Sequence, residues 1–138
     1  MSSKDIINAI KQLCGKVNML RNGWCHFVYR RLHFINIPDV NNRMIRISIP
    51  HIARSSDYNE EALSTAINEA NREMKYVKAL VLDNGSVALN YDHRTSIDEE
   101  AYEIVAHIIK TLYHGATYLL FKLQPYHNNR NADINHTC

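Results

Sequence analysis

Eight histidines and three cysteines are the side chains whose chemistry matters first in this chain. His107 and His114 lie seven positions apart, so a helix would present both on one face, about two turns from each other. Metal-binding helices more often place two histidines four positions apart, with a further ligand nearby. We therefore interpret this pair as surface histidines at the rim of a packed helix, and we expect no metal site.

The cysteines form no catalytic pair. Cys25 and His26 are neighbours in a strand-like segment, and neighbouring strand side chains point to opposite faces of a sheet. Cys25 is therefore predicted to be a small core residue, as is Cys14. With Cys138 the number of cysteines is odd, and their spacing fits no disulfide framework or zinc pattern. Free thiols are typical of a reducing cytoplasm.

The acidic residues and the glycines also have structural explanations. Asp98, Glu99 and Glu100 fall in the predicted first turn of a helix, where carboxylates favour the positive end of the helix dipole. The four glycines form no phosphate-binding loop. The sequence therefore predicts no catalytic residues, no cofactor and no enzymatic activity.

The composition indicates one globular unit. The chain has 138 residues, of which 46% are hydrophobic and 22% charged, and its formal net charge is +2. We expect a single domain over residues 1–126 and a flexible tail, rich in Asn and His, over residues 127–138. No stretch approaches the ~20 apolar residues of a membrane span, and no signal peptide is recognisable, so we expect a cytoplasmic protein.

Hydrophobic periodicity predicts three helices. The first covers residues 3–15, with Ser3 as its cap and Gly15 at its end. The second begins near Asp57, which has capping-box spacing with Glu60, and runs to about residue 74. The third covers residues 97–123. It is expected to open at a capping box of Ser96 and Glu99, to bury Ile97 and to be weakened at Gly115.

Alternating apolar residues predict five strands. The aromatic run after residue 23 loses its alternation at Arg30-Arg31, which indicates a tight turn or a bulge. Pro50 is expected either to end the strand that precedes it or to mark an edge of the sheet. Asn84-Gly85 is typical of a type I′ turn between two strands. The expected strands are 24–30, 32–38, 43–49, 77–82 and 87–91.

The order of these elements predicts the fold class. It is α-β-β-β-α-β-β-α, which gives an α+β domain with two layers: a five-stranded, mostly antiparallel sheet and one layer of helices.

Two segments carry a resemblance to a known family. The run AINEANREMKYVK over residues 66–78, followed by a strand, an Asn-Gly turn and another strand, resembles the YbjN-like family of bacterial proteins, as does the run MIRISIPHI over residues 44–52. The resemblance covers residues 3–123. It implies a protein with a fold like that of type III secretion chaperones, which is often dimeric and acts by binding other proteins. It carries over no catalytic residue. Asn71 matches the pattern, and we expect it to satisfy backbone groups near a helix end.

The remaining functional candidates are surfaces. Aromatic residues off the main stripe of the last helix would suit either a protein interface or ordinary packing at the rim of the sheet. These are Tyr102, Tyr113, Tyr118 and Phe121. The first hypothesis is a non-enzymatic, chaperone-like or regulatory protein-binding module that forms a homodimer.

The alternative hypothesis is a nucleic-acid-binding module that uses a weakly basic face of the sheet. Its residues would be Arg30, Arg31, Arg43 and Arg46. The nearly balanced charge argues against nucleic acid as the partner, because affinity for nucleic acid comes from neutralising phosphates with a concentrated basic face.

Overall fold

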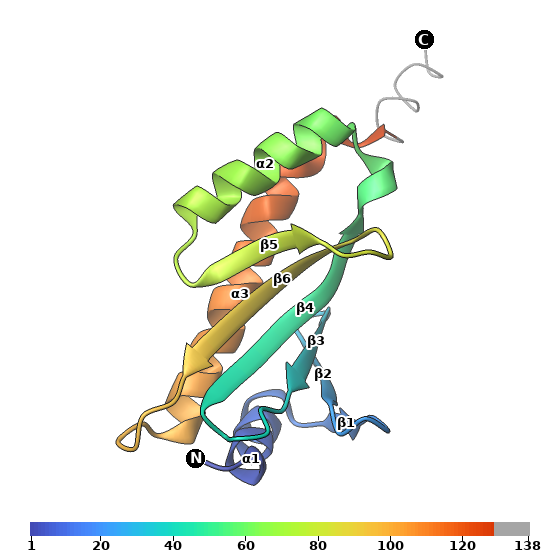
Figure 1. The fold of residues 1–138 in the computed structure, drawn as a ribbon. Coiled ribbons are helices and arrows are strands. Elements are labelled where there is room, and N and C mark those ends of the chain that lie inside the picture. Colours follow the sequence, from blue (N-terminus) through green and yellow to red (C-terminus); the bar gives the residue numbers. More distant parts are fainter. Residues whose placement is uncertain (129–138) are drawn as a thin grey trace.

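The computed structural model describes residues 1–128. Within them, six antiparallel strands form one sheet in the order β1-β2-β3-β4-β6-β5 (Figure 1). The strands are β1 Val17–Met19, β2 Cys25–Tyr29, β3 Leu32–Ile37, β4 Met44–Arg54, β5 Val77–Val81 and β6 Ser86–Arg94. Every strand pair is antiparallel, where a mostly antiparallel sheet was predicted, and β1 and β5 lie at the two edges.

The helices of the described residues cover one face of this sheet. They are α1 Ser3–Cys14, α2 Glu60–Glu73 and α3 Ala101–Leu123, with single 3₁₀ turns η1 Ser55–Asp57 and η2 Gln124–Tyr126. Figure 1 shows α3 crossing behind the sheet, with α1 near one end of it and α2 near the other. The predicted two-layer α+β class is therefore confirmed, with six strands in place of five.

The core lies between the sheet and α3. Strand residues that point toward the helices are fully buried, as are α3 residues on its sheet-facing side. These include Phe27, Phe34, Ile45, Ile47, Ile49 and Leu89 from the strands and Ile108, Ile109, Leu112 and Leu119 from α3. Each such side chain contributes roughly 1.5–3 kcal/mol by burial, so this interface fixes α3 on the sheet.

Two predicted turns are present, one of them in a different geometry. Arg30 and Arg31 both have positive φ, 48° and 71°, as the central pair of a tight hairpin between β2 and β3. The β5–β6 hairpin is confirmed, but the amide of Gly85 donates to the Leu82 carbonyl and only Gly85 has positive φ in this loop. It is therefore a three-residue loop closed by a glycine bulge, and the predicted type I′ turn is wrong.

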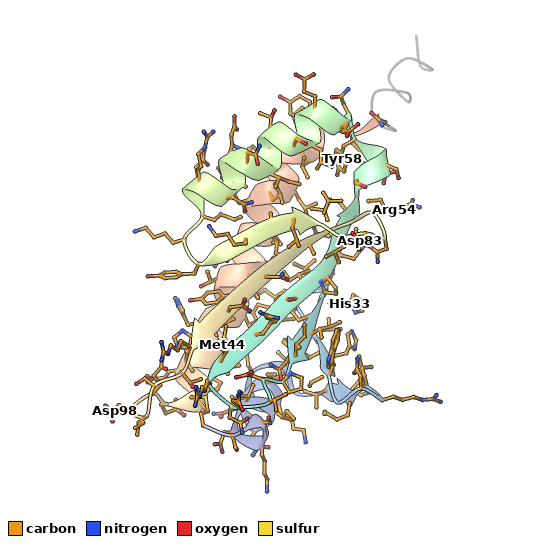
Figure 2. The ribbon with its side chains drawn as sticks, viewed as in Figure 1. His33, Met44, Arg54, Tyr58, Asp83 and Asp98 are labelled. Carbon is orange, nitrogen blue, oxygen red and sulfur yellow. The ribbon has the colours of Figure 1, made fainter. Side chains whose placement is uncertain are left out.

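The prediction that Pro50 ends a strand is also wrong. Strand β4 runs eleven residues, through Pro50 to Arg54, and its register with β6 shifts between Ile49 and Ala53. Met44 and Arg54, labelled in Figure 2, mark its two ends. The irregularity accommodates the residue that has no amide hydrogen, so the strand continues past it.

The residues that cap the three helices differ from the predicted ones by one to four positions. Ser2 and Asn59 cap α1 and α2, in place of Ser3 and Asp57. Helix α3 begins at Ala101, where the Glu100 carboxylate accepts from two amides of the first turn. The predicted start at residue 97 is wrong.

The segment before α3 is a loop. The Glu99 carboxylate accepts from the amide of Ser96 and pairs with His93 Nε2 at 2.7 Å, so it braces the loop between β6 and α3. Ile97 is 99% exposed in that loop and is not a core residue. Gly115, expected to weaken the last helix, lies buried within a continuous α3.

The described part of the chain ends against η1. His127 forms a single β-bridge with Tyr58, and its ring meets the Tyr58 ring edge-on at 5.2 Å. The rest of the predicted tail, residues 129–138, lies outside the described residues.

Candidate protein-binding groove

A groove of about 320 Å³ lies between α3 and the connection from α2 to β5. Its lining is mostly apolar and comes from two segments that are 30 or more residues apart in sequence. One wall is Met74, Lys75, Tyr76 and Val77; the other is His107, Thr111, His114, Gly115 and Tyr118. We refer to this feature as the α3 groove.

Helical spacing explains the α3 wall. The positions that line the groove follow i, i+4, i+7, i+8 and i+11, which keeps them on one side of the helix. The prediction that His107 and His114 share a helix face is therefore confirmed. Both imidazoles lie at the groove, where they add polar atoms to an otherwise apolar wall.

Three aromatic rings, from Tyr76, Tyr91 and His107, meet beside the groove. The Tyr76 ring lies parallel to the Tyr91 ring, with their centroids 5.9 Å apart, and His107 meets Tyr91 edge-on at 6.4 Å. Tyr91 is buried, and this burial raises the pKa of its hydroxyl. Tyr76 is 68% exposed, so much of its aromatic surface is available to a partner.

The backbone at Tyr76 is unusual for an aromatic residue. Its φ is +69°, in the left-handed region that few residues other than glycine adopt. This conformation turns the chain from α2 into β5 while the ring lies over Tyr91. This backbone conformation costs about 1–3 kcal/mol in a residue other than glycine, and such residues cluster at functional sites. The wall that contains Tyr76 is therefore a candidate binding surface.

Gly115 sets how closely the two walls approach. A Cβ atom at this position would lie 3.2 Å from Met74 Sδ and 3.4 Å from Val77 Cγ1. Glycine therefore lets the start of β5 pack directly on α3. The sequence alone shows a glycine in a helix; only the tertiary structure shows how closely Met74 and Val77 approach it.

The side chains that line the groove include basic groups and no acidic ones. Lys75 is basic, and the two imidazoles can only be neutral or cationic. None of the residues that line the groove, all within the described part of the chain, is acidic. The lining therefore favours an apolar group that is accompanied by negative charge.

A larger hollow, about 490 Å³, lies between α2 and the end of α3, but its lysine already has carboxylate partners. Lys122 Nζ lies 2.9 Å from Glu69 and 3.8 Å from Glu73. The hydrogen bond to Glu69 raises the pKa of Lys122 and lowers that of Glu69. Because Lys122, the basic residue of this hollow, is already paired, we prefer the smaller, more apolar α3 groove as the functional candidate.

The predicted aromatic interface does not form one surface. Tyr118 lines the α3 groove, with Lys122 Nζ 5.4 Å from its ring centre. Tyr102 is half-buried against the core, and Phe121 is 75% exposed outside the groove. Tyr113 packs edge-on against Tyr29 elsewhere on the helix, with ring centroids 5.8 Å apart.

The four arginines of the alternative hypothesis are also dispersed. Arg30 and Arg31 precede β3, whereas Arg43 adjoins Met44 at the start of β4, beyond the other end of β3. The Arg30 guanidinium lies 5.4 Å from the ring centres of Tyr29 and Tyr113. Arg46 donates two hydrogen bonds to Asp92, at 2.7 and 3.0 Å. The structure does not gather these charges into one patch.

Over residues 1–128, no three His, Cys, Asp or Glu side chains are placed to hold one metal ion. No helix in this range is long and apolar enough to cross a membrane. Cys25 is buried on the core face and His26 lies on the other face, as the strand pattern predicts. Burial raises the pKa of the Cys14 thiol to about 11.

No protein-family model and no curated protein matches the chain. A solved structure does match its fold. A chain in the heterodimeric ExoU–SpcU complex from the type III secretion system of Pseudomonas aeruginosa aligns with a TM-score of 0.59 over 86% of this chain and 97% of that chain. The two sequences are 13% identical, so the likeness is one of fold. The expected resemblance to the fold of type III secretion chaperones is therefore matched by a chain from a type III secretion complex.

Proposed function

We propose that this protein is a non-enzymatic, chaperone-like module that binds another protein through the α3 groove. The observation that carries the proposal is the groove itself: an open, mostly apolar hollow beside an exposed, stacked Tyr76. The shared fold with a chain of a heterodimeric secretion complex supports a protein as the ligand. Apolar hollows with aromatic walls are typical positions for the anchor residues of a protein partner.

The partner segment that fits best has one apolar or aromatic anchor with acidic residues beside it. The anchor would fill the space over Gly115 and stack near Tyr76, where the lining is apolar. Acidic neighbours would meet Lys75 and the two imidazoles without facing a carboxylate of the lining.

We propose that the module acts as a homodimer in the cytoplasm and that it belongs to the YbjN-like family. Light scattering coupled to gel filtration at micromolar concentration tests the homodimer, and a mass of one chain across that range would refute it.

Display of random peptides tests the groove. Peptides are selected on the wild-type protein, and their dissociation constants are then measured by fluorescence anisotropy. We expect the selected sequences to share an apolar anchor flanked by Asp or Glu. Thr111→Glu, which places a carboxylate in the groove wall, is expected to weaken binding at least about tenfold, because it repels the acidic flank.

Thr117→Glu is the matched control. Thr117 is exposed on the same helix but does not line the groove, so the same substitution changes the net charge equally. Binding within about twofold of wild type is expected for this variant. Equal loss in both variants, or selected peptides with no acidic preference, would refute the groove as the binding site.

A further inference from the structure

The two histidines of the α3 groove differ from the other histidines that the structure describes. His107 and His114 are exposed, and within residues 1–128 neither imidazole forms a hydrogen bond or an ion pair with another side chain. The other described histidines all have side-chain partners: His26 and His33 pair with each other, His51 with Ser86, His93 with Glu99 and His127 with Asp57. The two groove imidazoles therefore remain available to groups that a bound partner brings.

Protonation of these two rings changes the charge of the groove. Histidine is the side chain whose ordinary titration falls between pH 5 and 8. Lys75 is the other basic group of the lining, so two protonated imidazoles add to its charge without an acidic residue of the lining to offset them. We propose that pH regulates the α3 groove, which holds an acidic partner segment more tightly when His107 and His114 are protonated. This inference rests on the protein-binding function proposed for the groove.

The wall opposite α3 supplies no acid to the imidazoles. From β6, the Tyr91 ring meets His107 edge-on, and burial raises the pKa of the Tyr91 hydroxyl, so that this group stays neutral from pH 5 to 8. From the connection between α2 and β5, Tyr76 and Lys75 face the same space. In the empty groove the protonated rings repel Lys75, and the carboxylates of a bound segment offset this repulsion.

The groups on the α3 side carry mixed charge. Tyr113 meets the His114 ring edge-on at 5.7 Å, and the Arg30 guanidinium lies 5.4 Å from the centre of the Tyr113 ring. Lys110 and Glu103 are exposed about one turn of α3 from the histidines, outside the groove lining, and their charges are opposite. The carboxylates of a bound segment are therefore the acidic groups that protonated imidazoles would meet inside the groove.

Linkage makes this effect reciprocal. If bound protons tighten the binding of the segment, the bound segment favours the binding of protons by the same factor. Formation of the complex near pH 6.5 is therefore expected to take up protons. Isothermal titration calorimetry in two buffers of different ionisation enthalpy measures this uptake, and a complex that takes up no protons at this pH contradicts the inference.

The affinity of a groove-selected peptide at two pH values tests the regulation. Its dissociation constant is measured by fluorescence anisotropy at pH 7.5 and pH 5.5, at constant ionic strength. We expect a dissociation constant at least about fivefold lower at pH 5.5, because protonation creates two exposed ion pairs with the acidic flank. The same peptide with Asp and Glu replaced by Asn and Gln should change by less than about twofold.

Two double variants assign the effect to the groove histidines. His107→Gln/His114→Gln is expected to abolish the dependence on pH, whereas the matched control His33→Gln/His51→Gln, at exposed strand positions, keeps it. Circular dichroism at both pH values establishes that each variant is folded. A wild-type affinity that is equal at both pH values, or a dependence that survives in His107→Gln/His114→Gln, overturns the inference. If Thr111→Glu still weakens binding in that case, the proposed function stands; equal affinities of Thr111→Glu and Thr117→Glu overturn both.

Discussion

The side chain of Asn71 closes the free edge of β5, and its removal gives a sharp test of the fold. Asn71, in the last turn of α2, donates through Nδ2 to the Ala79 carbonyl at 2.9 Å and accepts through Oδ1 from the Ala79 amide at 2.7 Å. It pairs with Ala79 much as a residue of a neighbouring strand would. This confirms the expected structural role, with the backbone of a strand as the group that Asn71 satisfies.

The magnitude follows from the two hydrogen bonds. Each contributes about 0.5–1.5 kcal/mol, and a buried backbone group left without a partner costs about 1–3 kcal/mol. Ala79 is 4% exposed, so water replaces the lost partner poorly. We therefore expect Asn71→Ala to lower the free energy of unfolding by about 2–3 kcal/mol.

Urea unfolding followed by circular dichroism measures the change. The matched control is Asn68→Ala, the same substitution at an exposed position of the same helix, for which a change below about 0.5 kcal/mol is expected. Because the variant also exposes strand hydrogen-bonding groups at an edge, light scattering should show increased self-association. An Asn71→Ala protein as stable as Asn68→Ala would refute the inferred role.

Two further predictions concern buried groups. Burial raises the pKa of the Cys14 thiol from 9.0 to about 11, so its alkylation by iodoacetamide at pH 8, followed by peptide mass spectrometry, should be about 100-fold slower in the folded than in the urea-unfolded chain. Since the folded-state pKa is the higher one, this contribution to stability is present below pH 9 and declines toward pH 11; equal alkylation rates would contradict it. Phe34→Ala should cost about 3–5 kcal/mol in urea unfolding, because Phe34 is fully buried and stacked on Phe27; a loss below about 1 kcal/mol would show that the site is not core.

Local patterns in the sequence account for much of the fold. The alternation of Ile45, Ile47 and Ile49 predicts the central strand, and the slip at Arg30-Arg31 predicts a turn. Strand β1 has only three residues, too few for a period of two to be recognised, and it is ordered by pairing with β2. Pro50 ends a strand in isolation, but an irregularity in the register with β6 absorbs it.

The α3 groove could be predicted only in part. The spacing of His107 and His114 places them on one helix face, but their proximity to Tyr76 depends on how α3 crosses the sheet. The positive φ of Tyr76 and the contact of Gly115 with Met74 are likewise tertiary features. Local periodicity carries no information about which segment packs opposite a helix face, and the groove is made by that choice.

Protein binding through the α3 groove is tested most directly by the affinity of one selected peptide for two variants. Thr111→Glu and Thr117→Glu add the same charge to the same helix, the first in the groove wall and the second outside it. The predicted result is a dissociation constant raised at least about tenfold by Thr111→Glu and left within about twofold by Thr117→Glu. Equal dissociation constants for the two variants would contradict it.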